Sequence, residues 1–207
     1  MNEVALLGGG FNPVGLHHQK IAQTIWREVK IPTWFMPCYS HRFAKHSELA
    51  LSSHRWNMVT EVTGDNKYMR SCDWEMAHEH NGAMYETLQG LAKAHPNTRF
   101  NIVIGMDNAN VMTTDVDGEP GWARGEYLIK ENSFLVLQRT GVETQVDWFL
   151  EEPHRLLTFD CPTSSSEIRQ AIAAGDYAFA QQHLHRRVWE YIIAGSLYGY
   201  TKDRDHG

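Results

Sequence analysis

The chain has 207 residues, 42% of them hydrophobic, which is enough to bury one core of the size found in a single α/β domain. Its formal net charge of −6 excludes a global positive field, so nucleic acid is not an expected partner and a small phosphorylated ligand fits better. The three cysteines, Cys38, Cys72 and Cys161, are scattered, which argues against a disulfide framework and a cysteine zinc site. No secretory signal or membrane-spanning run is visible, so no membrane contact and a cytoplasmic location are expected.

Short apolar runs of strand character alternate with segments of helical periodicity along the chain. Strands are expected at Val4–Leu7, Thr33–Met36, Arg99–Ile104, Phe134–Leu137 and Leu156–Phe159. Helices are expected from His18 to Val29 and at Ser53–Thr63, Tyr85–Ala94, Glu167–Ala174, Tyr177–Leu184 and Arg186–Ala194. This alternation predicts an α/β fold with a Rossmann-like, doubly wound parallel sheet and a helical C-terminal end.

Two longer segments, Tyr39–Ser52 and Thr113–Gly125, are polar, and their apolar residues follow neither the helical period nor the two-residue period of a strand. They are predicted to be surface loops, of a length that in a compact α/β domain often covers a ligand. In Lys67–Met76, polar and apolar residues alternate only roughly, and this segment is interpreted as an additional strand at a sheet edge. Because no repeat and no linker is visible, residues 1–207 are interpreted as one domain, with residues 160–200 carrying a second nucleotide motif and the C-terminal helices.

A glycine-rich turn follows the first predicted strand. It spans Gly8–Pro13, and His17 and His18 stand at the start of the next helix. Glycines let the backbone approach a ligand closely, and the free amides and positive dipole end of a helix favour an anion. In an open α/β sheet, ligands bind beyond the carboxyl ends of the strands, where this turn lies. A glycine triplet alone is also an ordinary βα turn, but the Asn-Pro pair and the histidines favour a phosphate site.

A second motif, Thr163–Arg169, follows the last predicted strand and opens another helix. Ser164 and Glu167 have the spacing of a capping box, which explains a serine at a helix start without any ligand. A cap does not require Arg169, however. An arginine beside hydroxyl groups at a helix N-terminus is suited to phosphate oxygens.

Together the two motifs resemble those of the nicotinamide/nicotinate mononucleotide adenylyltransferase family, in the nucleotidyltransferase group with HxGH-like and SSTxxR-like motifs. Gly9–Pro13 with His18 is similar to the family signature G-[ST]-F-[ND]-P-x-[HT]-x-x-H, and Ser165–Arg169 is similar to S-[ST]-x-x-R. Further similar features are Gly105-Met106-Asp107, His54-Arg55 and Tyr191–Tyr198. The resemblance therefore spans nearly the whole chain.

The chain departs from the family pattern at three positions. Gly15 stands where the family has His or Thr, so one phosphate donor is missing. His17, beside the matching His18, is a candidate replacement for that donor, although neighbouring residues on a helix point in different directions. Gly10 replaces the common Ser or Thr, and Ser166 stands in for Thr. These changes bear on the rate more than on the reaction.

The resemblance implies that the 5′-phosphate of a pyridine mononucleotide attacks the α-phosphorus of ATP, so that pyrophosphate leaves and NAD or deamido-NAD forms. Such an enzyme positions two polyanions and neutralises their charge with Mg²⁺ and basic groups. His18, at the α/β phosphates, and Arg169, at the β/γ end, are the implied catalytic residues. Asp107 would accept a hydrogen bond from a hydroxyl of the ATP ribose. Without a ligand, the same residue could be the N-cap of a helix starting near Asn108. The implied ATP-binding residues are Gly8, Gly9, Gly10, Phe11, His18, Gly105, Asp107, Ser165, Ser166 and Arg169.

The resemblance also implies contacts to the mononucleotide. Asn12 is one such residue, and a basic residue of the first polar loop would face substrate phosphate, with Arg42 and Lys45 as open alternatives. Trp74 and Trp122 match positions where related enzymes place aromatic rings against the pyridine ring. Trp122 is the stronger candidate, because a tryptophan in a glycine-rich loop is harder to explain as core. Trp74 also fits simple packing.

The sequence predicts no metal site within the chain, since its 12 histidines are dispersed without zinc-type spacing. Mg²⁺ is expected with ATP. Alternatives are another small-molecule nucleotidyltransferase, of the pantetheine-phosphate adenylyltransferase or cytidylyltransferase type, and a catalytically weak nucleotide-binding sensor, suggested by Gly15. A dinucleotide-dependent oxidoreductase is disfavoured because G-x-G-x-x-G is absent after the first strand. The choice between nicotinate and nicotinamide stays open, and a homo-oligomer is compatible with the sequence.

Overall fold

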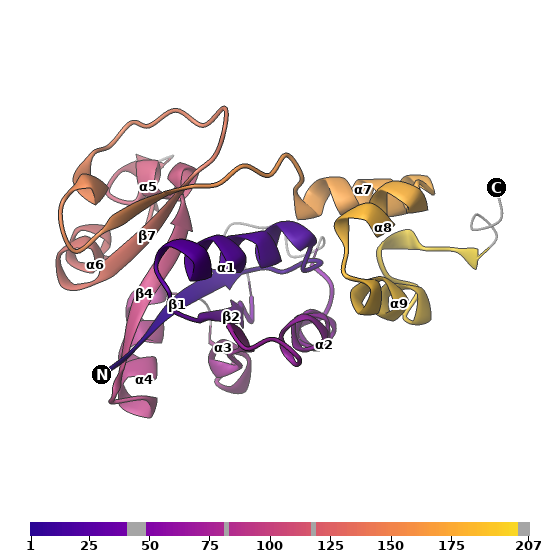
Figure 1. Ribbon diagram of the computed structural model, residues 1–207, viewed down its shortest axis with the longest axis horizontal. Helices are drawn as coiled ribbons and strands as arrows, with labels where there is room; N and C mark the ends of the chain where they lie inside the picture. The colour runs from indigo at the N-terminus through magenta and orange to yellow at the C-terminus, as the bar shows by residue number, and fades with distance from the viewer. Residues whose placement is uncertain (41–48, 81–82, 117–118, 203–207) are drawn as a thin grey trace.

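A six-stranded parallel sheet forms the centre of the molecule (Figure 1). The structure is a computed structural model, which describes residues 1–40, 49–80, 83–116 and 119–202. The strand order is β3-β2-β1-β4-β7-β8. The strands are β1 (Asn2–Gly9), β2 (Thr33–Pro37), β3 (Met69–Ser71), β4 (Thr98–Gly105), β7 (Ser133–Gln138) and β8 (Arg155–Thr158). The order runs outward in both directions from the β1–β4 pair, which is the doubly wound arrangement of a Rossmann-like fold. The predicted fold class is confirmed.

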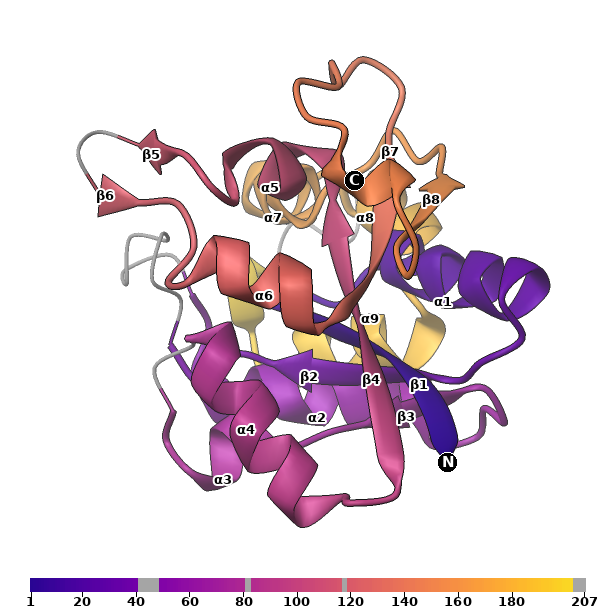
Figure 2. The same ribbon diagram turned by 90° about the vertical axis from the view of Figure 1, so that its left-hand side faces the viewer.

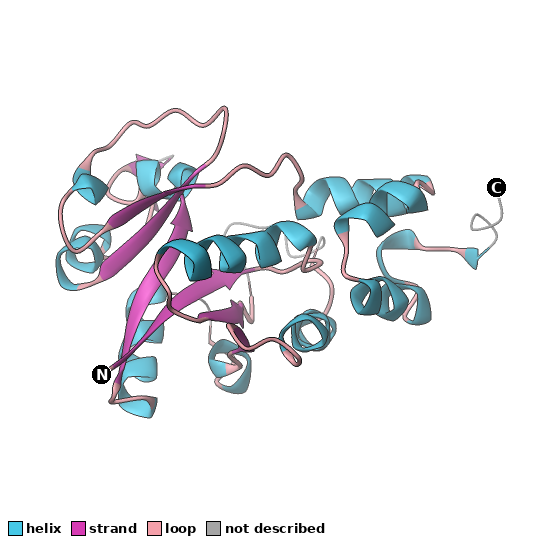
Figure 3. Cartoon of the chain, viewed as in Figure 1, coloured by secondary structure: helices cyan, strands magenta, loops and turns pink. Residues whose placement is uncertain are grey.

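Helices cover both faces of this sheet, and the C-terminal helices lie together beyond the ends of β1 and β2 (Figures 1 and 3). The helices are α1 (Leu16–Glu28), α2 (Ser52–Thr63), α3 (Trp74–Ala77), α4 (Met84–Ala94), α5 (Met106–Val111), α6 (Gly125–Glu131), α7 (Ser165–Ala174), α8 (Tyr177–His183) and α9 (Arg186–Ala194). None of the helices in these described ranges is long and apolar enough to cross a membrane.

Alternating residues of β1 divide the core between the two faces of the sheet. Ala5 and Leu7 pack into a cluster with α1, α2 and the three C-terminal helices. Val4 and Leu6 face the other side, where α4 packs, and α5 and α6 pack further along the sheet (Figure 2). This alternation follows from the two-residue period of a strand, while burial on both faces explains why the strands read as continuous apolar runs.

Several predicted elements have different bounds or contents in the structure. The edge position of β3 is confirmed, but this strand ends at Ser71 and a short helix begins at Trp74. The second polar loop contains a hairpin of β5 (Asp115–Val116) and β6 (Glu119–Pro120). Two-residue strands are too short to show a period, which is why the sequence pattern did not reveal them.

The capping box predicted at the start of α7 is present. The Ser164 hydroxyl accepts a hydrogen bond from the Glu167 amide at 3.3 Å, and the Glu167 carboxylate accepts one from the Ser164 amide at 2.7 Å. The helix ends at Gly175, whose φ of 84° lies in the left-handed region that favours glycine. Local sequence therefore sets both ends of α7.

Candidate functional site

A cavity of about 330 Å³ opens at the carboxyl ends of β1, β4 and β7. Its walls include Gly8 and Gly9 from β1, Gly105 from the end of β4, and Arg139 directly after β7. Because helices connect outward on opposite faces from β1 and β4, the carboxyl edge between these strands is the switch point where doubly wound sheets bind ligands. The position of the cavity thus makes it the candidate site.

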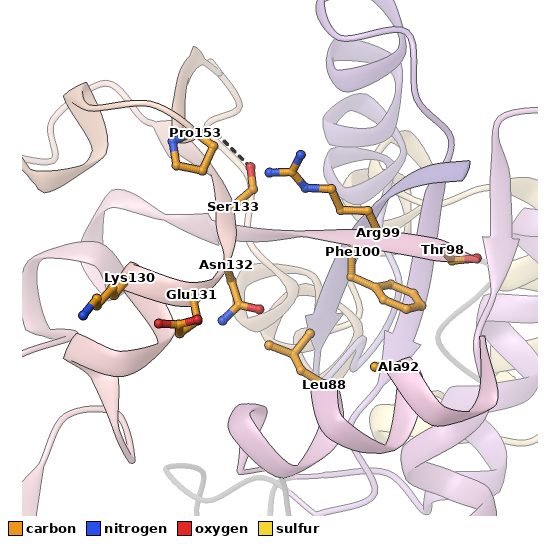
Figure 4. A pocket seen from close by; sticks show the side chains of 10 residues that line it. All are labelled: Leu88, Ala92, Thr98, Arg99, Phe100, Lys130, Glu131, Asn132, Ser133 and Pro153. Atoms are coloured by element: carbon orange, nitrogen blue, oxygen red, sulfur yellow. Dashed lines mark hydrogen bonds between the residues drawn. The ribbon is translucent and has the colours of Figure 1, made fainter. Parts of the chain in front are cut away.

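A second cavity of about 210 Å³ lies at the opposite edge of the sheet, between α4 and the first residues of β4 and β7 (Figure 4). Arg99 and Lys130 are among its lining residues, and the Ser133 hydroxyl donates a hydrogen bond to the Pro153 carbonyl there at 2.8 Å. None of the site residues predicted from the sequence lines it. The carboxyl-edge cavity is therefore kept as the candidate functional site.

His18 reaches the candidate site from the first turn of α1. Its Nδ1 accepts a hydrogen bond from the Gly15 amide at 3.1 Å, and its side chain lines the cavity. Burial, with smaller contributions from His17 and Arg139, lowers the pKa of His18 well below its ordinary value. A neutral imidazole that accepts at Nδ1 carries its hydrogen on Nε2. His18 is thus prepared to donate one hydrogen bond to an anion.

The two signature segments lie side by side, although they are far apart in the sequence. The Ser165 hydroxyl donates to the Pro13 carbonyl at 2.9 Å, and Arg169 Nη1 donates to the Asn12 carbonyl at 2.8 Å. Arg169 Nη2 also donates to the Ser166 hydroxyl at 3.3 Å. The start of α7 is thereby joined to the glycine turn. These α7 residues do not line the 330 Å³ cavity.

Asn12 and Phe11 are buried residues of the glycine turn, and neither lines the cavity. The Asn12 side-chain oxygen accepts hydrogen bonds from the Ala50 amide at 3.0 Å and the Tyr198 hydroxyl at 2.9 Å. Burial raises the pKa of Tyr198, so its hydroxyl keeps the hydrogen that it donates. Phe11 has a left-handed φ of 46°, and its buried ring packs 4.9 Å from the ring of His18.

Arg55 connects the glycine turn to the loops around it. Its guanidinium donates to the backbone carbonyls of Ala50 and Gly10, each at 3.0 Å, and to those of Cys38 at 2.6 Å and Tyr39 at 2.9 Å. The side chain is only 1% exposed. A planar fork of donors can satisfy several buried carbonyls at once, so Arg55 is a positioning residue for the site.

Asp107 is exposed at the wall of the cavity, in the first turn of α5. The alternative that it caps a helix starting near Asn108 is wrong, because α5 begins at Met106, its N-cap is Gly105 and no side chain makes the cap hydrogen bond. A Cβ atom at Gly105 would collide with the Asp107 carboxylate. Glycine at this strand end therefore leaves room for the carboxylate.

The two candidate tryptophans lie in different surroundings. Trp122 lines the cavity, and it packs at the edge of the core cluster that involves α5 and α6. Trp74 does not line the cavity: its ring fills the space beside Gly90 of α4 and stacks on His78 with centroids 4.6 Å apart. A glycine in the middle of a helix was the sequence signal for this packing, because it makes room for a large neighbour.

Arg42 and Lys45 lie outside the described residues. The N-terminal end of their loop does reach the site, since Ser40 and the preceding Cys38 line the cavity. The first polar loop thus borders the candidate site, as loops after the strands of an α/β sheet commonly do.

Arg139 and Glu75 line the cavity but were missed by sequence reasoning. The Nε of Arg139 is buried without a hydrogen-bond partner among the described residues. Glu75 is 4% exposed; burial raises its pKa, and the Thr87 hydroxyl donates to it at 3.3 Å. Arg139 could have been found by its place directly after a predicted strand. Glu75 gives no such signal, since its burial depends on tertiary packing.

Three comparisons place the chain among known proteins. Residues 6–171 match the family described as cytidylyltransferase-like. The chain is 25% identical over 202 residues to a probable nicotinate-nucleotide adenylyltransferase of Bacillus cytotoxicus, covering 96% of this chain and 99% of that protein.

Solved structures agree with the fold. Plasmodium falciparum nicotinic acid mononucleotide adenylyltransferase complexed with NaAD superposes with a TM-score of 0.75 at 22% identity, covering 97% of this chain and 99% of the other. Its complex with APC gives a TM-score of 0.73 with the same identity and coverage. A putative nicotinate-nucleotide adenylyltransferase from Vibrio parahaemolyticus gives 0.63 at 16% identity, covering 92% of this chain and 97% of that one.

Proposed function

Since the chain belongs to the cytidylyltransferase-like family and is a nucleotidyltransferase, we propose that it transfers the adenylyl group of ATP to nicotinate or nicotinamide mononucleotide. The products are deamido-NAD or NAD, and pyrophosphate. The observation that carries the proposal is the junction of the glycine turn with α7 beside the switch-point cavity, through the hydrogen bonds of Ser165 and Arg169. It brings both candidate phosphate-binding motifs to one place.

The chemistry requires positioning rather than a protein nucleophile. An oxygen of the mononucleotide 5′-phosphate forms a bond to the α-phosphorus of ATP, and the bond from that phosphorus to the bridging oxygen breaks, so that pyrophosphate leaves with the electron pair. Nε2 of His18 donates to the phosphate oxygens where charge develops, and Arg169 contributes a fixed positive charge at the far end of the triphosphate. In this proposal Asp107 accepts a hydrogen bond from a ribose hydroxyl, and the ring of Trp122 packs against a heteroaromatic ring of the substrate.

Mg²⁺ fits this site as an ion that arrives with ATP. Within the described ranges, no group of three or more His, Cys, Asp or Glu side chains is arranged to hold a metal. Mg²⁺ commonly keeps several waters and binds substrate phosphates with few protein ligands, which agrees with that finding. When bound, the ion would neutralise negative charge on the triphosphate.

The names of the relatives favour nicotinate mononucleotide as the acceptor. The B. cytotoxicus protein is named for the nicotinate nucleotide, and the P. falciparum enzyme was solved with NaAD. We extend the proposal to the domain organisation: the chain forms one nucleotidyltransferase domain, because α7, α8 and α9 share one hydrophobic cluster with β1, α1 and α2.

Turnover with defined acceptors tests the function. The protein is incubated with ATP, MgCl₂ and nicotinate or nicotinamide mononucleotide, and pyrophosphate and the dinucleotide product are measured. We expect both products with the nicotinate compound, at a rate equal to or higher than that with the nicotinamide compound. Parallel reactions contain 4′-phosphopantetheine as acceptor or CTP in place of ATP. Turnover only in these reactions would indicate another nucleotidyltransferase, and ATP binding without pyrophosphate release would indicate a sensor.

A further inference from the structure

The space beside Gly15 is filled by the ring of His17. A Cβ atom at Gly15 would lie 2.6 Å from both Cε1 and Nδ1 of His17, closer than real Cβ contacts, and 3.0 Å from Cδ1 of Ile168 in α7. The imidazole of residue 17 therefore occupies the room that a side chain at residue 15 would need. This gap lies where the N-terminus of α1 meets α7.

The rings of His17 and His18 lie together, contrary to the expectation that neighbours on a helix point apart. Their centroids are 3.9 Å apart, with an interplanar angle of 40°. The turn of the His17 ring toward residue 15 explains this, because the missing side chain there lets the ring fold back over the helix start. The departure at Gly15 and the histidine at position 17 are thus two parts of one arrangement.

His17 is 6% exposed, and its Nδ1 has no hydrogen-bond partner within the described part of the chain. Buried polar groups in proteins are nearly always hydrogen-bonded, so such an atom requires an explanation. Burial, then the neighbouring Arg139 and His183, lower the pKa of His17 to about 4, while Glu167 raises it. Arg139 also has a buried nitrogen, Nε, without a partner among the described residues. Arg139 lines the 330 Å³ cavity together with His18, and His17, which does not itself line it, packs its ring 3.9 Å from that of His18 at the helix terminus that favours anions.

We propose that His17 is a phosphate-binding residue, whose imidazole is delivered from position 17 into the gap at Gly15 and binds the polyphosphate of the nucleotide together with His18 and Arg139. The inference rests on the proposed function insofar as it takes ATP as the natural ligand. It goes beyond the signature, which requires no particular residue at position 17. The anion supplies the partner that His17 Nδ1 lacks.

Three variants distinguish hydrogen bonding by the His17 ring nitrogens from packing by the ring. His17→Phe keeps an aromatic ring of similar size against His18 and removes both nitrogens. His17→Asn keeps a short hydrogen-bonding group. The double variant Gly15→His/His17→Gly moves the imidazole to residue 15, which restores the H-x-G-H order and avoids the collision that Gly15→His alone would cause. Thermal unfolding of each variant shows whether it is folded.

Binding of inorganic tripolyphosphate, without acceptor or turnover, is the first readout. We expect His17→Phe to weaken binding about tenfold, as for loss of one hydrogen bond to a charged group, and His17→Asn to weaken it less. The double variant should bind nearly as well as the original protein. In the unaltered protein, NMR signals of the His17 ring should shift when tripolyphosphate is added, and this measurement holds even if a variant fails to fold.

The outcomes are distinguishable from those for the proposed function. If His17→Phe binds tripolyphosphate as well as the unaltered protein, or if the His17 ring signals do not move, His17 is a packing residue and the inference is wrong. If tripolyphosphate binding depends on His17 but no mononucleotide is adenylylated, only the proposed reaction fails. With an active enzyme, the His17→Phe variant should show both a higher KM for ATP and a lower kcat.

Discussion

At the start of α1, one side chain both caps the helix and lines the candidate site. The first amides of a helix lack intrahelical partners, and the Gly15 amide is satisfied by Nδ1 of His18. That same bond fixes the tautomer of His18, whose side chain lines the cavity, and leaves Nε2 as its donor. A local cap thus determines which ring nitrogen of His18 is left to donate a hydrogen bond.

Replacement of His18 by Ala should reduce turnover much more than stability. Loss of one donor to a developing charge lowers kcat by about a hundredfold in comparable sites, and we expect an effect of this order. Steady-state kinetics with ATP and nicotinate mononucleotide measure it, with urea unfolding in parallel. His95→Ala is the matched control, because His95 ends α4 next to Trp34 and does not line the cavity. Nearly full activity of His18→Ala would contradict the phosphate assignment.

The lowered pKa of His17 predicts a specific acid sensitivity. A histidine has an ordinary pKa of 6.5, which applies to the unfolded chain, whereas the pKa of His17 in the folded protein is about 4. Between these pH values the unfolded chain therefore binds a proton that the folded protein does not. Stability contributed by the neutral ring is present above pH 6.5 and is lost as the pH falls toward 4. Each pH unit that separates the two pKa values corresponds to about 1.4 kcal/mol.

Urea unfolding across this pH range checks the prediction, with His17→Phe as comparison. The free energy of unfolding of the unaltered protein should fall more steeply with acid than that of the variant, since Phe takes up no proton. Equal slopes would show that His17 has the same pKa in the folded and unfolded states.

At the scale of elements, the site depends on how loops are tied to helices. Arg55, in the first turn of α2, bonds four carbonyls from three segments, including that of Gly10 in the glycine turn. The α7 start is joined to the same turn from the other side by Ser165. The turn therefore receives its shape from two helices that are separate in the sequence.

Arg55→Lys should destabilise the protein even though the charge is kept. A lysine cannot serve these carbonyls with a planar fork, and buried acceptors left unpaired cost free energy. We expect the free energy of unfolding to fall by about 2–4 kcal/mol, with a loss of activity. Arg70→Lys, at an exposed position on the edge strand β3, is the control and should stay within about 0.5 kcal/mol. Equal stability of both variants would show that the Arg55 contacts contribute little.

For the whole molecule, the strands and long helices could be predicted because their patterns are local. Runs such as Val4–Leu7 and Phe134–Leu137 are buried on both faces of a parallel sheet, and this burial requires continuous apolar residues. The sequence predicts less where tertiary packing determines the secondary structure. The strands β5 and β6 are too short to show a hydrophobic period, and α6, which begins at Gly125, is not among the predicted helices. The doubly wound parallel arrangement agreed with the prediction because right-handed crossover connections allow few alternatives.

The sequence by itself determined the fold class, the two signature segments and the capping box at Ser164, since each depends on residues close together in the chain. Only the tertiary structure decided what lies beside the site. It placed Trp74 against Gly90 outside the cavity, brought Arg139 to its wall, and turned the His17 ring into the space at Gly15. These contacts join residues on different elements or depend on the room that a missing side chain leaves, and neither is visible in local periodicity.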